Sequence, residues 1–293
     1  MNFIEEFKKG QSSKNQGIPF GPGLENLSRA LNNIQRGTST TVAAASKAGK
    51  STWVDCAFIL GPYLYWLQVL NTENRLDLVF VYFSFEMDRV SKEYDFACFF
   101  LHHFYGINKI MLPEGIKYKN KYGEIVDYIY LSSQYLRGRI QDVDGNTILC
   151  DADVKEKLKI VYEIHIVNLF GEYDDQGRQI KKGLIEFYDE AENPTGLRNR
   201  LMVKAEERGT FIKETFLDKA TNQNREKICG YKPYNPEEYI IVVTDTVRKL
   251  KKERGFTMKE NVDKWLEYTT MLVLLGIKFG ELLEHLEGKI TTT

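Results

Sequence analysis

The sequence predicts an α/β fold with a mainly parallel sheet and an inserted α+β region. Three apolar runs, at residues 41–45, 76–85 and 239–245, have the composition of strands. The second run is almost entirely apolar and aromatic, as a strand covered on both faces should be. Helical patterns follow the first two runs, at 50–70 and 88–105. This strand–helix–strand alternation predicts parallel strands joined by right-handed crossovers.

The composition is that of a folded protein without a strong overall charge. The chain has 293 residues, 43% of them hydrophobic, which is enough for one large or two small domains. The formal net charge is −1, so any binding to nucleic acid must use local basic patches. The four cysteines show no CxxC or histidine pairing, which indicates reduced structural thiols rather than a zinc site. The sequence shows no signal peptide and no apolar run of ~20 residues, so we expect a cytoplasmic protein without a membrane span.

The segments before the first strand are turn-rich. Residues 1–16 are polar, and we expect a loose arm or one short helix there. Glycine and proline punctuate residues 17–23. Apolar side chains at helical spacing follow over 24–31, and residues 32–37 then turn into the first strand.

The first strand leads into a phosphate-binding loop that ends in Gly-Lys-Ser-Thr at 49–52. In a strand–loop–helix of this kind, backbone N–H groups and a helix N-terminus face one point, where an anion is favoured. Lys50 would reach the β- and γ-phosphates, and the Ser51 hydroxyl would ligate Mg²⁺. The alternative is a chance Gly-Lys-Ser at a helix start. The predicted nucleotide-binding residues are Ala44, Ala45, Ser46, Lys47, Ala48, Gly49, Lys50, Ser51 and Thr52.

A carboxylate residue lies at the C-terminal end of each of the two other predicted strands. Glu86 follows the strand at 76–85, where it could polarise a water against the γ-phosphate. Asp245 ends the strand at 239–245, which is the layout of the acid on the Mg²⁺ side of a nucleotide site, the Walker B acid. Each could instead be an ordinary solvated acid at the end of a strand. Because all three features should meet at one sheet edge, together they favour phosphate chemistry.

The middle of the chain, 107–235, reads as an inserted α+β region rather than a linker, because it is too hydrophobic to be disordered. We predict helices and hairpins in it. The helices are expected at 123–138, 152–167 and 195–208, and the hairpins at 139–150, around 174–177 and at 210–232.

The stretch after Asp245 is basic and suits contacts to the DNA backbone. A solvated charged turn is the equally weighted alternative. A helix at 259–275 and a polar tail at 276–293 follow. The candidate DNA-binding residues are Arg248, Lys249, Lys251, Lys252 and Arg254.

Several of these segments resemble one known family. Phe-Ser-Phe-Glu-Met at 83–87 resembles the F-S-L-E-M motif of DnaB-type replicative helicases, in the RecA-like branch of P-loop ATPases. The lead-in at 17–21 and the segment at 34–37 are similar to the start of that family's ATPase core. Residues 193–196 and 244–248 look like the bacteriophage-encoded subgroup. The resemblance covers about residues 17–268.

The resemblance implies a RecA-like core formed by residues 17–106 and 236–275. It implies Lys50 and Glu86 as catalytic residues, with Glu86 as the base, and Ser51 and Asp245 as Mg²⁺ ligands. ATP and Mg²⁺ would be the cofactors and single-stranded DNA the partner, in phage DNA replication in the host cytoplasm. A hexameric ring is implied if the C-terminal part is present.

The chain departs from the family pattern in two places. Ala44 stands where the loop usually has glycine. RecA-like ATPases also place a strand that ends in Gln or His between the phosphate-loop strand and the Walker B strand, and we find no such strand after Asp245. We therefore expect a truncation or frame shift after about residue 270.

Two other functions stay open. A nucleotide or small-molecule kinase can use the same loop, although such kinases usually carry an Arg-rich lid, which the insert does not clearly contain. A non-catalytic nucleotide- or DNA-binding remnant is favoured by the missing sensor strand.

Overall fold

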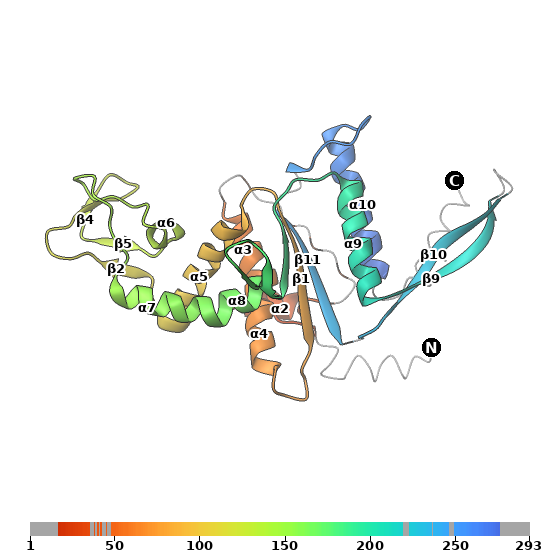
Figure 1. Cartoon of the computed structure of the whole chain (residues 1–293), viewed down its shortest axis with the longest axis horizontal. Coiled ribbons are helices and arrows are strands. Elements are labelled where there is room, and N and C mark those ends of the chain that lie inside the picture. The colour runs from red at the N-terminus through yellow and green to blue at the C-terminus, as the bar shows by residue number, and fades with distance from the viewer. Residues whose placement is uncertain are drawn as a thin grey trace. The chain divides into compact units, whose positions relative to one another are not determined.

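The computed structural model of the chain is shown in Figure 1. The arm at 1–16, the tail at 276–293 and several phosphate-loop residues lie outside the part of the chain that it describes. The described residues are 17–35, 38, 40, 42, 45, 48–218, 223–235, 237–245 and 249–275, with side chains up to 268.

A three-stranded parallel sheet lies at the centre of the fold. Its strand order is β11 (Glu238–Asp245), β1 (Asp77–Ser84) and β8 (Ile185–Tyr188). β1 pairs with β8 from Phe80↔Ile185 to Phe83↔Tyr188. The rings of Phe80 and Phe83 are fully buried, which explains why the β1 sequence lacks an alternating pattern. The predicted strands at 76–85 and 239–245 are confirmed, whereas β8 was not predicted.

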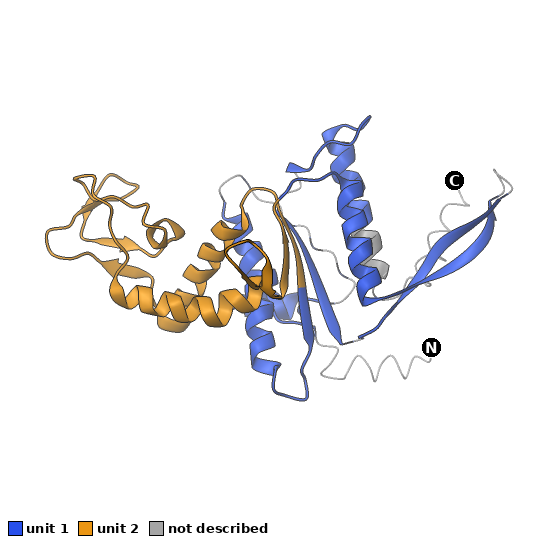
Figure 2. Ribbon diagram, viewed as in Figure 1, with its two compact units in different colours: residues 1–79, 190–293 blue, residues 80–189 orange. Residues whose placement is uncertain are grey.

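The chain divides into two compact units, which Figure 2 colours separately. One unit comprises residues 1–79 and 190–293, and the other comprises residues 80–189, so that one boundary falls within β1. The domain limits expected from the sequence, with an insert at 107–235, stay a prediction.

In the first unit, one continuous helical segment runs from Lys50 to Val69, as predicted. It consists of α3 (Lys50–Asp55), a π-helical turn η2 (Cys56–Leu60) and α4 (Gly61–Val69). Pro62 lies in the first turn of α4, directly after the π-helical turn. Because proline has no N–H group and its ring crowds the carbonyl four residues earlier, the wider π turn accommodates it.

The other described elements of the first unit include three helices and a long hairpin. α9 and α10 lie side by side (Figure 1). The predicted helices at 195–208 and 259–275 and the predicted hairpin at 210–232 are confirmed. Among the described residues, we find no helix that combines the length and the apolarity needed to cross a bilayer. The elements are α2 (Glu25–Ala30), α9 (Pro194–Arg208), β9 (Gly209–Asp218), β10 (Gln223–Pro233) and α10 (Met258–Leu275).

In the second unit, helices alternate with small antiparallel hairpins. α5 begins at a cap in which the Asp88 side chain accepts a hydrogen bond from Ser91 N at 2.7 Å. The helices predicted at 88–105 and 152–167 are confirmed. The elements are α5 (Arg89–Tyr105), β2 (Lys109–Met111), β3 (Tyr118–Lys119), β4 (Ile125–Val126), β5 (Tyr128–Tyr130), α6 (Ser133–Leu136), α7 (Ala152–Val161), π-helical η3 (Tyr162–Ile166), α8 (Val167–Phe170), β6 (Glu172–Tyr173) and β7 (Gln179–Lys181).

Three turns of the second unit share one local pattern. In each, an Asn or Asp side chain accepts hydrogen bonds from the backbone N–H groups two and four residues later. A glycine three residues after the Asn or Asp has a positive φ, which other residues rarely adopt. The pairs are Asn120 with Gly123, Asp142 with Gly145, and Asp174 with Gly177.

The same pattern corrects one prediction. The predicted hairpins at 139–150 and 174–177 are confirmed, the former as a Gln141↔Thr147 bridge. The helix predicted over 123–138 is wrong for most of its length, because the Asn120 turn folds this segment into β3, β4 and β5. Only Ser133–Leu136 is helical there.

Gly61 lies where the lead-in to the phosphate loop crosses α4. A Cβ atom added to Gly61 would lie within 3.0 Å of the Cα and N atoms of Gly21, and one added to Gly21 would meet the Cys56 carbonyl equally closely. Both segments are therefore limited to glycine at this crossing, because backbone atoms have no flexible end that could move aside.

We predict that Gly61→Ala lowers the free energy of unfolding by about 1–3 kcal/mol, because of overpacking. Alanine is otherwise the better helix former by about 1 kcal/mol. Urea denaturation measures the change. The matched control is Gln68→Ala, at an exposed position of the same helix, where we expect a change within about 0.5 kcal/mol. Equal stabilities for the two variants would contradict the close crossing.

An aromatic cluster joins α5 to η3 in the second unit. The His165 ring stacks on Phe100 and Phe104, with centroid distances of 4.7 and 4.6 Å. Burial lowers the pKa of His165 to about 4, with a further contribution from His103. The imidazole is therefore neutral in the folded protein well below its ordinary pKa.

We predict that stability falls as the pH drops from about 6.5 to about 4, because the unfolded chain then binds a proton that folded His165 does not. Urea denaturation at several pH values measures this slope. His165→Phe should flatten it, whereas His102→Phe, at an exposed position of α5, should leave it unchanged. An unchanged slope in His165→Phe would assign the acid sensitivity to other groups.

Candidate phosphate and metal site

The helix α3 begins directly after a glycine in the left-handed conformation. Gly49 caps the helix in the left-handed region, with φ 78° and ψ 19°, so a residue without a Cβ is favoured there. Gly49 O accepts the hydrogen bond from Trp53 N at 2.9 Å, which places Lys50 and Ser51 in the first helical turn. The first N–H groups of a helix have no partner within it and can face an anion.

Most of the preceding loop lies outside the described residues. Ala44, Ser46 and Lys47 belong to that part. Ala45 and Ala48 are described and exposed, and Ala48 N donates to Ala45 O at 3.3 Å. The predicted strand at 41–45 can therefore be followed only at Val42 and Ala45, where the backbone belongs to no helix or strand.

Ser51 and Asp245 meet in the folded chain. The Ser51 hydroxyl donates a hydrogen bond to Asp245 Oδ1 at 3.0 Å, although the two residues are 194 positions apart in the sequence. Both belong to the first unit. The structure thus brings together the two residues that the sequence singled out as metal ligands.

The strand β11 determines where the Asp245 carboxylate lies. Along this strand, Ile241, Val243 and Asp245 are buried, and the intervening Ile240 and Val242 are exposed. Asp245 is only 4% exposed, so the alternation of the strand directs its carboxylate to the same covered face as the two apolar side chains. A buried carboxylate needs polar partners, and Ser51 is one of them.

The two side chains fit a hard divalent cation. A serine hydroxyl and an aspartate carboxylate offer oxygen atoms, which Mg²⁺ prefers, and Mg²⁺ in proteins is usually bound by one or two such groups together with water and substrate phosphates. Their oxygen atoms already lie 3.0 Å apart. The pair could therefore hold Mg²⁺ beside a phosphate at the start of α3.

Glu86 lies in a turn of fixed geometry. It is exposed and follows β1 directly. The buried Ser84 donates a hydrogen bond to Met87 O at 2.7 Å, and the Asp88 cap then begins α5. The segment at 83–87 thus connects β1 to α5 through a hydrogen-bonded turn. Glu86 belongs to the second unit, and its position beside Lys50 and Asp245 stays a prediction.

The described part of the basic stretch after β11, residues 249–254, is a loop. One buried leucine anchors this loop, and exposed basic side chains flank it. Lys249, Lys251 and Lys252 are exposed, as is Arg254, whereas Leu250 is buried. The backbone N–H of Lys251 donates to Glu192 O at 3.0 Å, next to the start of α9. Arg248 lies outside the described residues.

Glu253 is an anchor of this loop that the sequence analysis missed. Its carboxylate accepts hydrogen bonds from Thr195 N at 2.8 Å and from Lys264 Nζ at 2.5 Å, so it binds both α9 and α10. Burial alone would raise the pKa of Glu253, but the hydrogen bonds from Lys264 and Thr195 outweigh this effect and lower it. The sequence did contain a signal that could have pointed to Glu253, because it is an acidic residue within a basic run.

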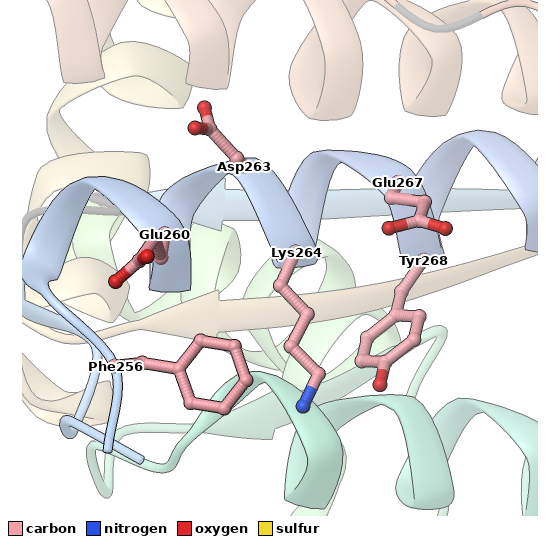
Figure 3. A pocket seen from close by; sticks show the side chains of 6 residues that line it. All are labelled: Phe256, Glu260, Asp263, Lys264, Glu267 and Tyr268. Carbon is pink, nitrogen blue, oxygen red and sulfur yellow. The ribbon is translucent and has the colours of Figure 1, made fainter. Parts of the chain in front are cut away.

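A shallow hollow of about 410 Å³ lies along α10, and Lys264 is one of the residues that line it (Figure 3). The Lys264 side chain points between Phe256 and Tyr268, with its Nζ atom 4.6 and 5.6 Å from the two ring centroids. Because Lys264 also binds Glu253, the chain's own ammonium group already occupies the position that a cationic ligand would take. Neither Ser51 nor Asp245 lines this hollow.

No protein-family model, curated protein or solved structure matches this chain. The function of the site must therefore be argued from its own residues.

We predict that Ser51→Ala lowers the free energy of unfolding by about 1.5–3 kcal/mol in the absence of nucleotide, because it removes a hydrogen bond to a buried carboxylate. Chemical denaturation measures the difference. The matched control is Thr52→Ala, which removes an exposed hydroxyl one position further along α3 and should be nearly neutral. If both variants lose the same stability, the hydrogen bond contributes nothing specific.

Proposed function

We propose that the chain is an ATP-binding, RecA-like ATPase of the DnaB helicase type, which couples ATP hydrolysis to movement along single-stranded DNA. The observation that carries this proposal is the hydrogen bond from Ser51 to Asp245. A chance Gly-Lys-Ser at a helix start does not require a buried carboxylate, from a strand 194 residues later, at its hydroxyl.

Each residue of the site has a defined role in this proposal. Lys50 and the N–H groups at the start of α3 would bind the β- and γ-phosphates, while Ser51 and Asp245 would hold Mg²⁺. Mg²⁺, when bound, neutralises charge that develops on the phosphate oxygens. Glu86, in the turn after β1, would accept a proton from the attacking water.

The loop after β11 provides a surface for DNA in the same unit as Asp245. Its exposed Lys249, Lys251, Lys252 and Arg254 follow that acid within a few residues. The anchors at Leu250 and Glu253 hold the backbone in place between these side chains. Contacts of lysine and arginine to phosphates would give binding that weakens with added salt.

Nucleotide binding without turnover is the second candidate. It is favoured by the strand order β11–β1–β8, in which β11 is an end strand of the described sheet. In the RecA-like arrangement, a strand with a polar sensor residue would lie beside β11. A chain that lacks this strand would bind ATP and leave it intact.

We predict ATPase activity that single-stranded DNA stimulates and that falls about 100-fold or more in Lys50→Ala and Glu86→Gln. The lysine variant loses charge stabilisation, and the glutamate variant loses the base. Phosphate release, measured with and without oligothymidylate, tests this. Lys259→Ala and Glu73→Gln change exposed residues of the same types and should leave the rate unchanged.

The alternatives give different results in the same experiment. Consumption of ATP that requires an added nucleoside or metabolite as acceptor would indicate a kinase. ATP binding that depends on Lys50, with no phosphate release in any condition, would indicate the non-catalytic remnant.

A further inference from the structure

The small ladder of β2 and β5, in the second unit, has two faces of opposite character. The strands pair as Lys109↔Tyr130, Ile110↔Ile129 and Met111↔Tyr128. Because side chains alternate along a strand, the central isoleucine pair lies on one face and the two outer pairs lie on the other. Ile110 and Ile129 are buried, at 9% and 1% exposure. The other face therefore consists of two tyrosines, a methionine and a lysine.

This second face, which we call the tyrosine platform (Lys109, Met111, Tyr128 and Tyr130), is exposed at three of these residues and half-buried at Tyr128. Tyr130 is 65% exposed and Met111 is 61% exposed. The Tyr128 and Tyr130 rings are 5.6 Å apart at 82°, and Lys109 Nζ lies 3.6 Å from the Tyr128 ring centroid. Two large aromatic rings with an ammonium group are thus held at fixed positions by backbone pairing.

The neighbouring hairpin, β3 with β4, adds positive charge and one more ring. Lys117, Lys119 and Lys121 are exposed along one strand and its turn. Tyr122 is 76% exposed, with Lys121 Nζ 5.0 Å from its ring centroid. The Asn120 turn fixes the backbone here. Three exposed lysines and one exposed tyrosine therefore lie together in this hairpin.

We propose that the tyrosine platform binds single-stranded DNA by stacking an unpaired base on the exposed Tyr130, with the lysines of β2 and β3 contacting the phosphates. This inference rests on the proposed function, which supplies single-stranded DNA as the partner. It adds a second DNA-binding surface, in a different unit from the loop at 249–254.

The chemistry of the platform favours this partner over a protein or a lipid. Aromatic rings with adjacent ammonium groups complement bases joined by phosphates, which is the common arrangement for binding single strands without sequence preference. The acids nearby, Glu114, Glu124 and Asp127, nearly balance the lysines. Charge alone is therefore not expected to give tight binding, and stacking should add to phosphate contacts that weaken with added salt.

The test is binding of fluorescein-labelled oligothymidylate to the full chain, without nucleotide, followed by fluorescence anisotropy. We expect Tyr130→Ala to weaken binding about 5- to 100-fold, as for the loss of one stacked base. Tyr130→Phe keeps the ring and should bind like the unchanged chain. Tyr130→Leu keeps the apolar character without the ring and should bind nearly as weakly as Tyr130→Ala.

Two controls separate stacking from other causes. Tyr234→Ala removes a tyrosine that is 70% exposed in the first unit and should leave the affinity unchanged. An abasic oligomer keeps the phosphates without the bases, and we expect weak binding of it that is equal for the unchanged chain and Tyr130→Ala.

Several results would overturn the proposal. The first is equal affinity of Tyr130→Ala and the unchanged chain, and the second is equal affinity of Tyr130→Leu and Tyr130→Phe. The third is an equal loss of affinity for the abasic oligomer in Tyr130→Ala, and the fourth is tighter binding of oligouridylate than of oligothymidylate. The ATPase assay is independent of these measurements. A chain that hydrolyses no ATP but binds DNA through Tyr130 would overturn the proposed function alone, and DNA-stimulated hydrolysis without any effect of Tyr130 would overturn the platform alone.

Discussion

The hydrogen bond between Ser51 and Asp245 is the interaction on which the candidate site depends. It joins the start of α3 to the end of β11. Because the Asp245 carboxylate has left water almost completely, the serine hydroxyl offsets part of the cost of its burial. The two oxygen atoms are already adjacent before any phosphate binds, so little conformational freedom is lost when a ligand arrives. The left-handed Gly49 also helps to preorganise the site, because it fixes where α3 begins.

The position of β11 contrasts with its sequence. Residues 239–243 are an unbroken apolar and aromatic run, typical of an interior strand, yet Ile240 and Val242 are exposed and β11 is an end strand of the described sheet. Apolar edge strands invite pairing with another strand. The segment that the family resemblance places in this sheet, at 41–45, lies largely outside the described residues.

Long periodic segments and turn motifs could be predicted from the sequence, whereas short elements that depend on distant partners could not. β1, α5, the helix from Lys50 to Val69 and α10 each follow from a pattern of apolar residues. β8 has only four residues, Ile-Glu-Phe-Tyr, and becomes a strand by pairing with β1. The helix predicted at 123–138 was wrong because the Asn120 side chain and Gly123 form a turn that pairs this segment into β3, β4 and β5. At the site, Ser51 could be named from the Gly-Lys-Ser motif and Asp245 from a strand end. Glu253 could not, because the hydrogen bond that it accepts from Thr195 N depends on a helix 58 residues away in the sequence.

The three Asn or Asp turns also bear on the order in which the chain folds. Their hydrogen bonds span at most four residues, and hairpins of this size form within microseconds. The contact between Ser51 and Asp245 spans 194 residues, and such long-range contacts form slowly. During synthesis, the whole of the second unit has left the ribosome before Asp245 exists as a residue, and domains generally fold as units in the order of their synthesis. We therefore expect residues 80–189 to acquire their hairpins first and the contact between Ser51 and Asp245 to form later.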